Sequence, residues 1–133
     1  MGCVMRRLLV VEDDAEMREL LRKVLEKDGF QVQLAADGRE AGALLGAGGY
    51  EQFDVVVTDL LMPRDGGLEL LGLIHRTRPA LPVIIVTAFG DWESYSRALE
   101  LGAAAFISKP LKMAELTSAV HAALARREAA ASS

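Results

Sequence analysis

The sequence contains a single cysteine, Cys3, so it cannot form an internal disulfide, and this usage suits a reducing cytosol. Aromatic residues make up only 5% of the chain, against 51% hydrophobic residues in all, so any core must be built from aliphatic side chains. No apolar run approaches the ~20 residues that a membrane-spanning helix needs. The apolar segment near the N-terminus is also too short for a signal peptide. These absences predict a cytoplasmic protein without membrane association.

Charge and length narrow the possible functions further. The formal net charge of −4 gives no electrostatic reason to expect direct nucleic-acid binding by this chain. Its 133 residues are enough for one domain with a substantial core. We expect residues 1–128 to form that domain, and residues 129–133 to be a disordered tail or the start of a linker.

Short aliphatic runs alternate along the chain with segments of helical periodicity. The runs expected to be strands are residues 8–11, 31–36, 53–59, 82–88 and 104–110. Three of them are nearly continuous in apolar residues, as in parallel strands covered on both faces. The expected helices lie around residues 17–25, where Gly29 ends the helix, and around 38–46, 66–77, 91–101 and 116–124. This alternation predicts an α/β fold, a flavodoxin-like (βα)5 doubly wound sandwich whose five-stranded parallel sheet has the order 2-1-3-4-5.

Polar residues stand at the ends of four of the five expected strands. Glu12 and Asp13 follow the first strand, and Asp59 ends the third. Thr87 ends the fourth strand and Lys109 follows the fifth. The carboxyl ends of parallel strands share one edge of the sheet, and the first and third strands are neighbours in this order. The three acids should therefore face one crevice, with Thr87 and Lys109 on its far rim.

Three carboxylates in one crevice are electrostatically costly. Two of them about 4 Å apart repel by roughly 4 kcal/mol at an effective dielectric of 20, which corresponds to about three pKa units. Either one carboxyl is protonated or cations neutralise the cluster. Lys109 supplies one positive charge, and a divalent metal would supply the rest. Because all the candidate ligands are oxygens, Mg²⁺ is favoured over zinc.

The chain resembles the receiver domains of response regulators in bacterial two-component signalling. The resemblance covers residues 6 to about 126 and rests on four motifs, which occur in order and each at an expected strand end. The motifs are "LLVVEDD", "DVVVTDLLMPRDGG", "PVIIVTA" and "FISKP". The resemblance implies a phosphorylation-activated signalling switch. Such a domain is not an enzyme in the usual sense, because it catalyses only its own phosphorylation and dephosphorylation.

The resemblance also implies roles for the residues at the strand ends. Asp59 takes the place of the phosphoacceptor, whose donor is a phosphohistidine on a sensor histidine kinase or phosphotransfer protein. Glu12 and Asp13 match the acidic pair that holds Mg²⁺ directly or through water, with Asp59 and the backbone carbonyl of Leu61 as further ligands. Glu12 stands where the family more often has aspartate, and its longer arm is less suited to a water-mediated metal contact.

Four further positions match the parts of the family that respond to phosphorylation. Thr87 corresponds to the hydroxyl residue that binds the phosphoryl group, and Lys109 to the lysine that pairs with it. Pro110 matches a proline that follows a cis peptide bond. Phe106 matches an aromatic switch residue, which turns inward when Thr87 moves. The face made by the fourth helix, fifth strand and fifth helix would then be remodelled for homodimerisation or partner binding.

Some of these residues also have purely structural interpretations. We favour Asp14 as the N-cap of the first helix, with Ala15 as the first helical residue. Asp13 could instead form a capping box with Glu16. Phe106 could be an ordinary core residue.

Two other functions fit part of the pattern. A Mg²⁺-dependent aspartyl-phosphate phosphatase of the haloacid-dehalogenase type also uses a strand-end aspartate, a threonine and a lysine, but it needs a second aspartate where this chain has Leu61. A pseudo-receiver is an interaction module that is no longer phosphorylated, and it has usually lost one of the acids or the lysine. The segment from Thr87 to Leu111 is most similar to receivers that precede an ATPase and a DNA-binding region.

Overall fold

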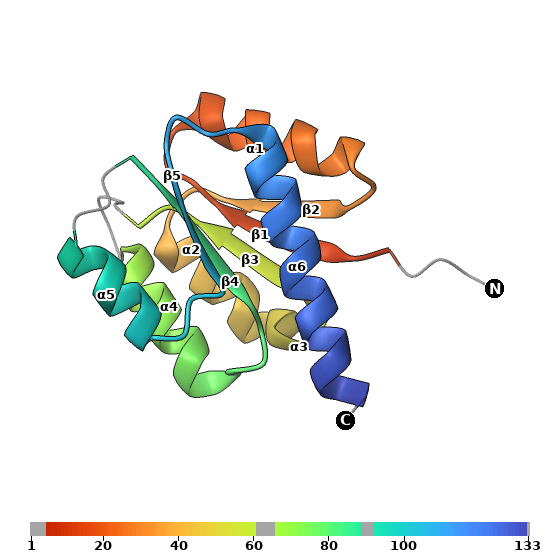
Figure 1. Ribbon diagram of the computed structural model, residues 1–133, viewed down its shortest axis with the longest axis vertical. Helices are drawn as coiled ribbons and strands as arrows, with labels where there is room; N and C mark the ends of the chain where they lie inside the picture. Colours follow the sequence, from red (N-terminus) through yellow and green to blue (C-terminus); the bar gives the residue numbers. More distant parts are fainter. Residues whose placement is uncertain (1–4, 61–65, 89–91, 133) are drawn as a thin grey trace.

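The computed structural model describes residues 5–60, 66–88 and 92–132 (Figure 1). Its centre is a sheet of five parallel strands in the order β2-β1-β3-β4-β5. The strands are β1 (Arg7–Val11), β2 (Gln31–Ala35), β3 (Val55–Thr58), β4 (Val83–Thr87) and β5 (Ala105–Ser108). The predicted fold class and strand order are confirmed.

Helices cover both faces of this sheet, so the molecule has three layers. The helices are α1 (Ala15–Lys27), α2 (Gly38–Leu44), α3 (Tyr50–Gln52), α4 (Gly67–Thr77), α5 (Trp92–Glu100) and α6 (Met113–Ser132). α1 and α6 lie on one face, and α2, α4 and α5 lie on the other (Figure 1). Each face has its own cluster of buried, mainly aliphatic side chains.

The apolar runs are continuous because both sides of the central strands are buried. In β3, Val55 and Val57 belong to the core beneath α1 and α6, while Val56 belongs to the core on the opposite face. β1 alternates in the same way, with Leu8 on one side and Leu9 on the other. Successive side chains of a strand point to opposite faces. When both faces are buried, no side chain of the strand reaches solvent, so apolar residues can occupy successive positions.

α1 begins and ends at the residues expected from the sequence. The Asp14 side chain accepts a hydrogen bond from the backbone N–H of Glu16 at 3.1 Å, which makes Asp14 the N-cap and Ala15 the first helical residue. The capping alternative for Asp13 is therefore not realised. At the other end the helix stops before Gly29, whose φ of +95° lies in the left-handed region that favours glycine.

The segment between α2 and β3 differs from the prediction. The sequence predicted one helix over residues 38–46, but α2 ends at Leu44 and passes into a wide helical turn, η1 (Leu45–Gly49), followed by the single turn of α3. Gly49 permits this arrangement because the backbone is tight: a Cβ there would lie 2.5 Å from the backbone oxygen of Leu44.

The C-terminal segment also differs from the prediction. α6 continues to Ser132, where the sequence predicted a disordered tail or linker from residue 129. Alanine, which occupies residues 129–131, has the highest helix propensity. The helix is also anchored near its end, because Arg127 Nη1 donates to the backbone oxygen of Asp54 at 2.9 Å. Within the described ranges, none of the helices has the combination of length and apolar character required to cross a membrane.

Candidate functional site

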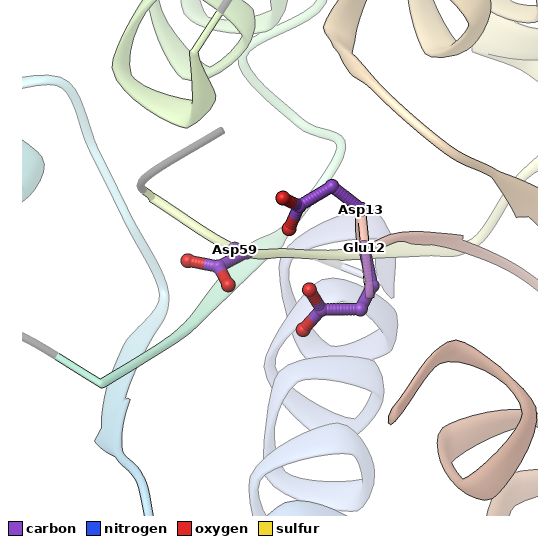
Figure 2. A group of neighbouring side chains, drawn as sticks. All are labelled: Glu12, Asp13 and Asp59. Carbon is purple, nitrogen blue, oxygen red and sulfur yellow. The ribbon is translucent and has the colours of Figure 1, made fainter. Parts of the chain in front are cut away.

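Three carboxylates converge where β1 and β3 end (Figure 2). Glu12 and Asp13 follow β1, and Asp59 follows β3, the neighbouring strand. One carboxylate oxygen from each residue lies within 4.8 Å of the others. Glu12 is only 1% exposed and Asp59 7%, whereas Asp13 is exposed to solvent. The strand order thus brings together acids that are distant in sequence.

Lys109 extends from the end of β5 into the same cluster. Its Nζ donates to Glu12 Oε1 at 2.8 Å and to Asp59 Oδ2 at 3.0 Å. Its backbone N–H donates to the backbone oxygen of Thr87 at 2.8 Å, which fixes the base of the side chain beside β4. The Lys109–Pro110 peptide bond is cis, the geometry that the resemblance implies.

Burial and the hydrogen bonds between charged groups have opposite effects on the pKa values of Glu12 and Lys109. Burial raises the pKa of the Glu12 carboxyl above its usual value, although the hydrogen bond from Lys109 opposes this shift. Burial alone would lower the pKa of Lys109, but its hydrogen bonds to Glu12 and Asp59 outweigh that effect and leave the pKa raised. Lys109 therefore remains a cation. One ammonium group cannot balance three carboxylates, so the cluster is suited to a further cation.

The donors in the cluster fit a hard divalent ion. All of them are oxygens, which suits Mg²⁺ or Ca²⁺ rather than zinc. Both oxygens of Glu12 already accept hydrogen bonds, one from Lys109 Nζ and one from the Asp14 backbone N–H at 3.2 Å. Asp13, by contrast, is exposed to solvent, and a carboxylate oxygen of this residue lies within 4.8 Å of the other two acids. Leu61, whose backbone carbonyl was predicted to be a ligand, lies outside the described residues.

Thr87 and Phe106 lie on the β4–β5 side of the site. Thr87 is fully buried at the end of β4, opposite Ser108 of β5. Phe106 is half-buried, and its ring meets the Tyr95 ring of α5 edge to face, with centroids 5.2 Å apart and planes at 77°. Phe106 is thus at the border of the core, in contact with a helix that covers the sheet, and not fully enclosed.

The start of α4 packs directly against the backbone of Asp59. A Cβ at Gly67 would lie 2.1 Å from the Asp59 backbone oxygen, and the Gly67 N–H donates to the backbone oxygen of Leu60 at 3.0 Å. Only a residue without a side chain fits there. Gly67 was not among the predicted site residues; the signal for it was its place in the glycine pair eight residues after Asp59.

We expect Gly67→Ala to destabilise the fold by about 1–3 kcal/mol, because the added methyl group forces the Asp59 backbone to shift. Gly42→Ala in α2 is the matched control, since nothing lies within 4 Å of a Cβ there. That substitution should be neutral or stabilising by up to about 1 kcal/mol. Urea unfolding of both variants measures the difference, and equal stabilities would contradict the close packing.

Arg18 is a second residue that the sequence analysis missed. It lies on the first turn of α1, and its Nη1 donates to the backbone oxygen of Glu12 at 2.9 Å. The sequence feature that could have indicated this contact is spacing. Arg18 lies one helical turn after the N-cap Asp14, so its long side chain can extend back to the residues before the helix.

Comparison with known proteins places these features in a family. Residues 8–121 match the family described as the response regulator receiver domain. The chain belongs to this family. It is 38% identical over 120 residues to the response regulator MprA of Mycolicibacterium vanbaalenii, a match that covers 90% of this chain and 51% of that protein. It is 36% identical over 122 residues to the transcriptional regulatory protein CpxR of Escherichia coli, covering 92% and 50%. The chain thus spans about half the length of the curated relatives it matches.

Solved receiver structures have the same architecture. The receiver domain protein from Clostridium thermocellum superposes with a TM-score of 0.86 at 30% identity, covering 93% of this chain and 98% of that one. NtrX from Brucella abortus, in complex with ADP, superposes with a TM-score of 0.87 at 28% identity, covering 97% of this chain and 29% of that one. Receiver domains are signalling switches of two-component systems and not enzymes in the usual sense, so the site belongs to a switch.

Proposed function

We propose that Asp59 is the phosphoacceptor of this receiver domain. The observation that carries the proposal is the position of its carboxylate, which is 7% exposed, bonded to Lys109 and within reach of Glu12 and Asp13. A sensor histidine kinase or phosphotransfer protein would donate the phosphoryl group. An Asp59 oxygen forms the new P–O bond while the P–N bond to the donor histidine breaks. Incubation with Mg²⁺ and acetyl phosphate tests this, because the intact protein should gain the mass of one phosphoryl group.

The other charged groups of the site fit roles in stabilising the transferred group. Lys109 already hydrogen-bonds the acceptor carboxylate. Its ammonium group could therefore bind an oxygen of the phosphoryl group on Asp59 after only a small movement. Asp13 and Asp59, with the Leu61 carbonyl, would hold Mg²⁺, and Glu12 would contact it through water, because both Glu12 oxygens are engaged by protein donors. When bound, the ion supplies neutralisation of the charge on the transferring oxygens.

The switch would act through Thr87 and Phe106. The acyl phosphate carries about two negative charges where Asp59 carried one, and the Thr87 hydroxyl is the buried donor at the end of the next strand. A shift of Thr87 toward the phosphoryl group would open space for Phe106. The Phe106 ring contacts Tyr95, so its rotation would alter the packing of α5 against β5. We therefore propose the α5-β5-α6 face as the surface that is remodelled for dimerisation or partner binding.

We expect Asp13→Asn to separate stability from metal binding. Without metal the variant should be more stable than the wild type by about 1 kcal/mol, because one of three mutually repelling carboxylates is gone. The gain is small because Asp13 is exposed and solvent screens its repulsion with the other two. The wild type should gain about 2.7 kcal/mol at a hundredfold excess of Mg²⁺ over Kd, and Asp13→Asn should gain much less.

Urea unfolding with Mg²⁺ and with EDTA measures both effects. Asp14→Asn is the control: it removes a neighbouring carboxylate, and asparagine caps a helix as well as aspartate does. It should keep the Mg²⁺ response. An equal Mg²⁺ response in Asp13→Asn and the wild type would exclude Asp13 as a ligand.

A further inference from the structure

Arg18 contacts the chain on both sides of Asp13. Its Nη1 donates to the backbone oxygen of Glu12 at 2.9 Å, and its own backbone N–H donates to the backbone oxygen of Asp14 at 2.8 Å. The first contact is made by a half-buried side chain and the second is the first hydrogen bond of α1. Asp13 is therefore an exposed residue between two backbone oxygens, those of Glu12 and Asp14, that both accept hydrogen bonds from Arg18.

Other hydrogen bonds fix the neighbours of Asp13 in place. The Glu12 N–H donates to the Ala35 backbone oxygen of β2 at 3.1 Å, and the Asp14 N–H donates to Glu12 Oε2 at 3.2 Å. The carbonyl group that Arg18 binds belongs to the peptide joining Glu12 to Asp13. Because a peptide unit is planar, holding that oxygen also fixes the orientation of the Asp13 N–H and the position of the Asp13 Cα, from which its side chain extends.

We propose that Arg18 is a positioning residue that keeps the exposed carboxylate of Asp13 aimed at the space it shares with Glu12 and Asp59. The proposal rests on the proposed function of that cluster as the Mg²⁺ site. Groups that orient metal ligands without touching the metal typically change affinity by about 10- to 100-fold when they are removed. Arg18 acts here on the ligand's backbone, through a planar guanidinium group that can hold an oxygen in a fixed direction.

The charge of Arg18 alone predicts the opposite effect. A guanidinium group next to the cluster repels a divalent cation, so removing only its charge should strengthen Mg²⁺ binding. Loss of positioning should weaken it. The sign of the change in Mg²⁺ affinity therefore distinguishes the two roles.

The test compares three variants of the full chain by calorimetric titration with Mg²⁺. Arg18→Met keeps the length of the side chain and removes its donors, and we expect it to weaken Mg²⁺ binding about tenfold. Arg18→Lys keeps the charge and one flexible donor group, so it should fall between Arg18→Met and the wild type. Arg22→Met is the control, because Arg22 lies one turn further along α1 and pairs with Glu19 and Glu26 on the helix surface; it should bind Mg²⁺ as the wild type does.

A second measurement needs no metal. Hydrogen exchange of the Asp13 and Asp14 amides in EDTA should be faster in Arg18→Met than in the wild type and in Arg22→Met. If the wild type binds no Mg²⁺, the proposed metal site fails, but the exchange comparison still tests whether Arg18 holds the loop. Unchanged exchange, unchanged Mg²⁺ affinity or tighter Mg²⁺ binding in Arg18→Met would each overturn the positioning role.

Discussion

Replacing Asp59 with asparagine should abolish phosphorylation of the protein. Asparagine has nearly the same size and can still accept a hydrogen bond from Lys109, so the site keeps its shape. Its amide oxygen is not a nucleophile toward phosphorus under these conditions, because the amide carries no negative charge. After incubation with Mg²⁺ and acetyl phosphate, the wild type should gain the mass of one phosphoryl group and Asp59→Asn should gain none.

The control for this experiment is another acid at the same edge of the sheet. Asp37 follows β2 and is the N-cap of α2, where its side chain accepts from the Glu40 N–H at 2.8 Å. Asp37→Asn should keep both the cap and the phosphorylation. A phosphoryl adduct on folded Asp59→Asn would show that the acceptor is not Asp59, and loss of the adduct in Asp37→Asn as well would show that the loss is not specific to Asp59.

The fold could be predicted because its main signals lie in short, contiguous stretches. The apolar run from Val55 to Val57 identifies a strand buried on both faces, and the spacing from Met17 to Leu25 identifies an amphipathic helix. The parallel order then places the strand ends along one edge. This is why residues as distant as Glu12 and Lys109 could be expected in one crevice, where the structure joins them at 2.8 Å.

The features that sequence reasoning missed depend on close approaches to the backbone of another residue. Gly67 looks like a turn residue until the structure shows the Asp59 carbonyl 2.1 Å from where its Cβ would be. Arg18 looks like a surface residue of an amphipathic helix until its guanidinium group is seen against the Glu12 carbonyl. Likewise, the wide turn before α3 depends on the close approach of Gly49 to Leu44, which no local propensity encodes.

Lys109 connects the stability of the domain to its proposed function. Its ammonium group is bonded to two carboxylates whose side chains are only 2% and 8% exposed. Water cannot replace Lys109 fully at either carboxylate, because both are buried by the surrounding strands. The lysine that we propose to bind the phosphoryl group therefore also compensates the buried negative charge of the resting site.

Replacing Lys109 with methionine should destabilise the metal-free protein by about 3–5 kcal/mol at neutral pH, because two buried carboxylates lose their shared cation. Lys112→Met is the matched control: Lys112 is exposed, three residues further along the chain, and its loss should cost less than about 0.5 kcal/mol. Urea unfolding in EDTA measures both. A Lys109→Met protein as stable as the control would mean that the carboxylates are neutralised in another way.

The loss in Lys109→Met should also depend on pH, with a defined sign. Burial already raises the pKa of Glu12, and the Lys109 hydrogen bond is the largest effect that lowers it, so removing Lys109 should raise this pKa further. A carboxyl whose pKa is higher in the folded state stabilises the fold below its unfolded pKa, and that stabilisation is lost as the pH rises through the folded value. The penalty of Lys109→Met should thus be smaller at about pH 5 than at neutral pH.

Adding Asp59→Asn to Lys109→Met should recover part of the lost stability, because this substitution removes one of the two unpaired carboxylates. A double-mutant cycle measures the recovery. Equal penalties at both pH values and no recovery in the double variant would show that Lys109 stabilises the fold by packing and not by charge.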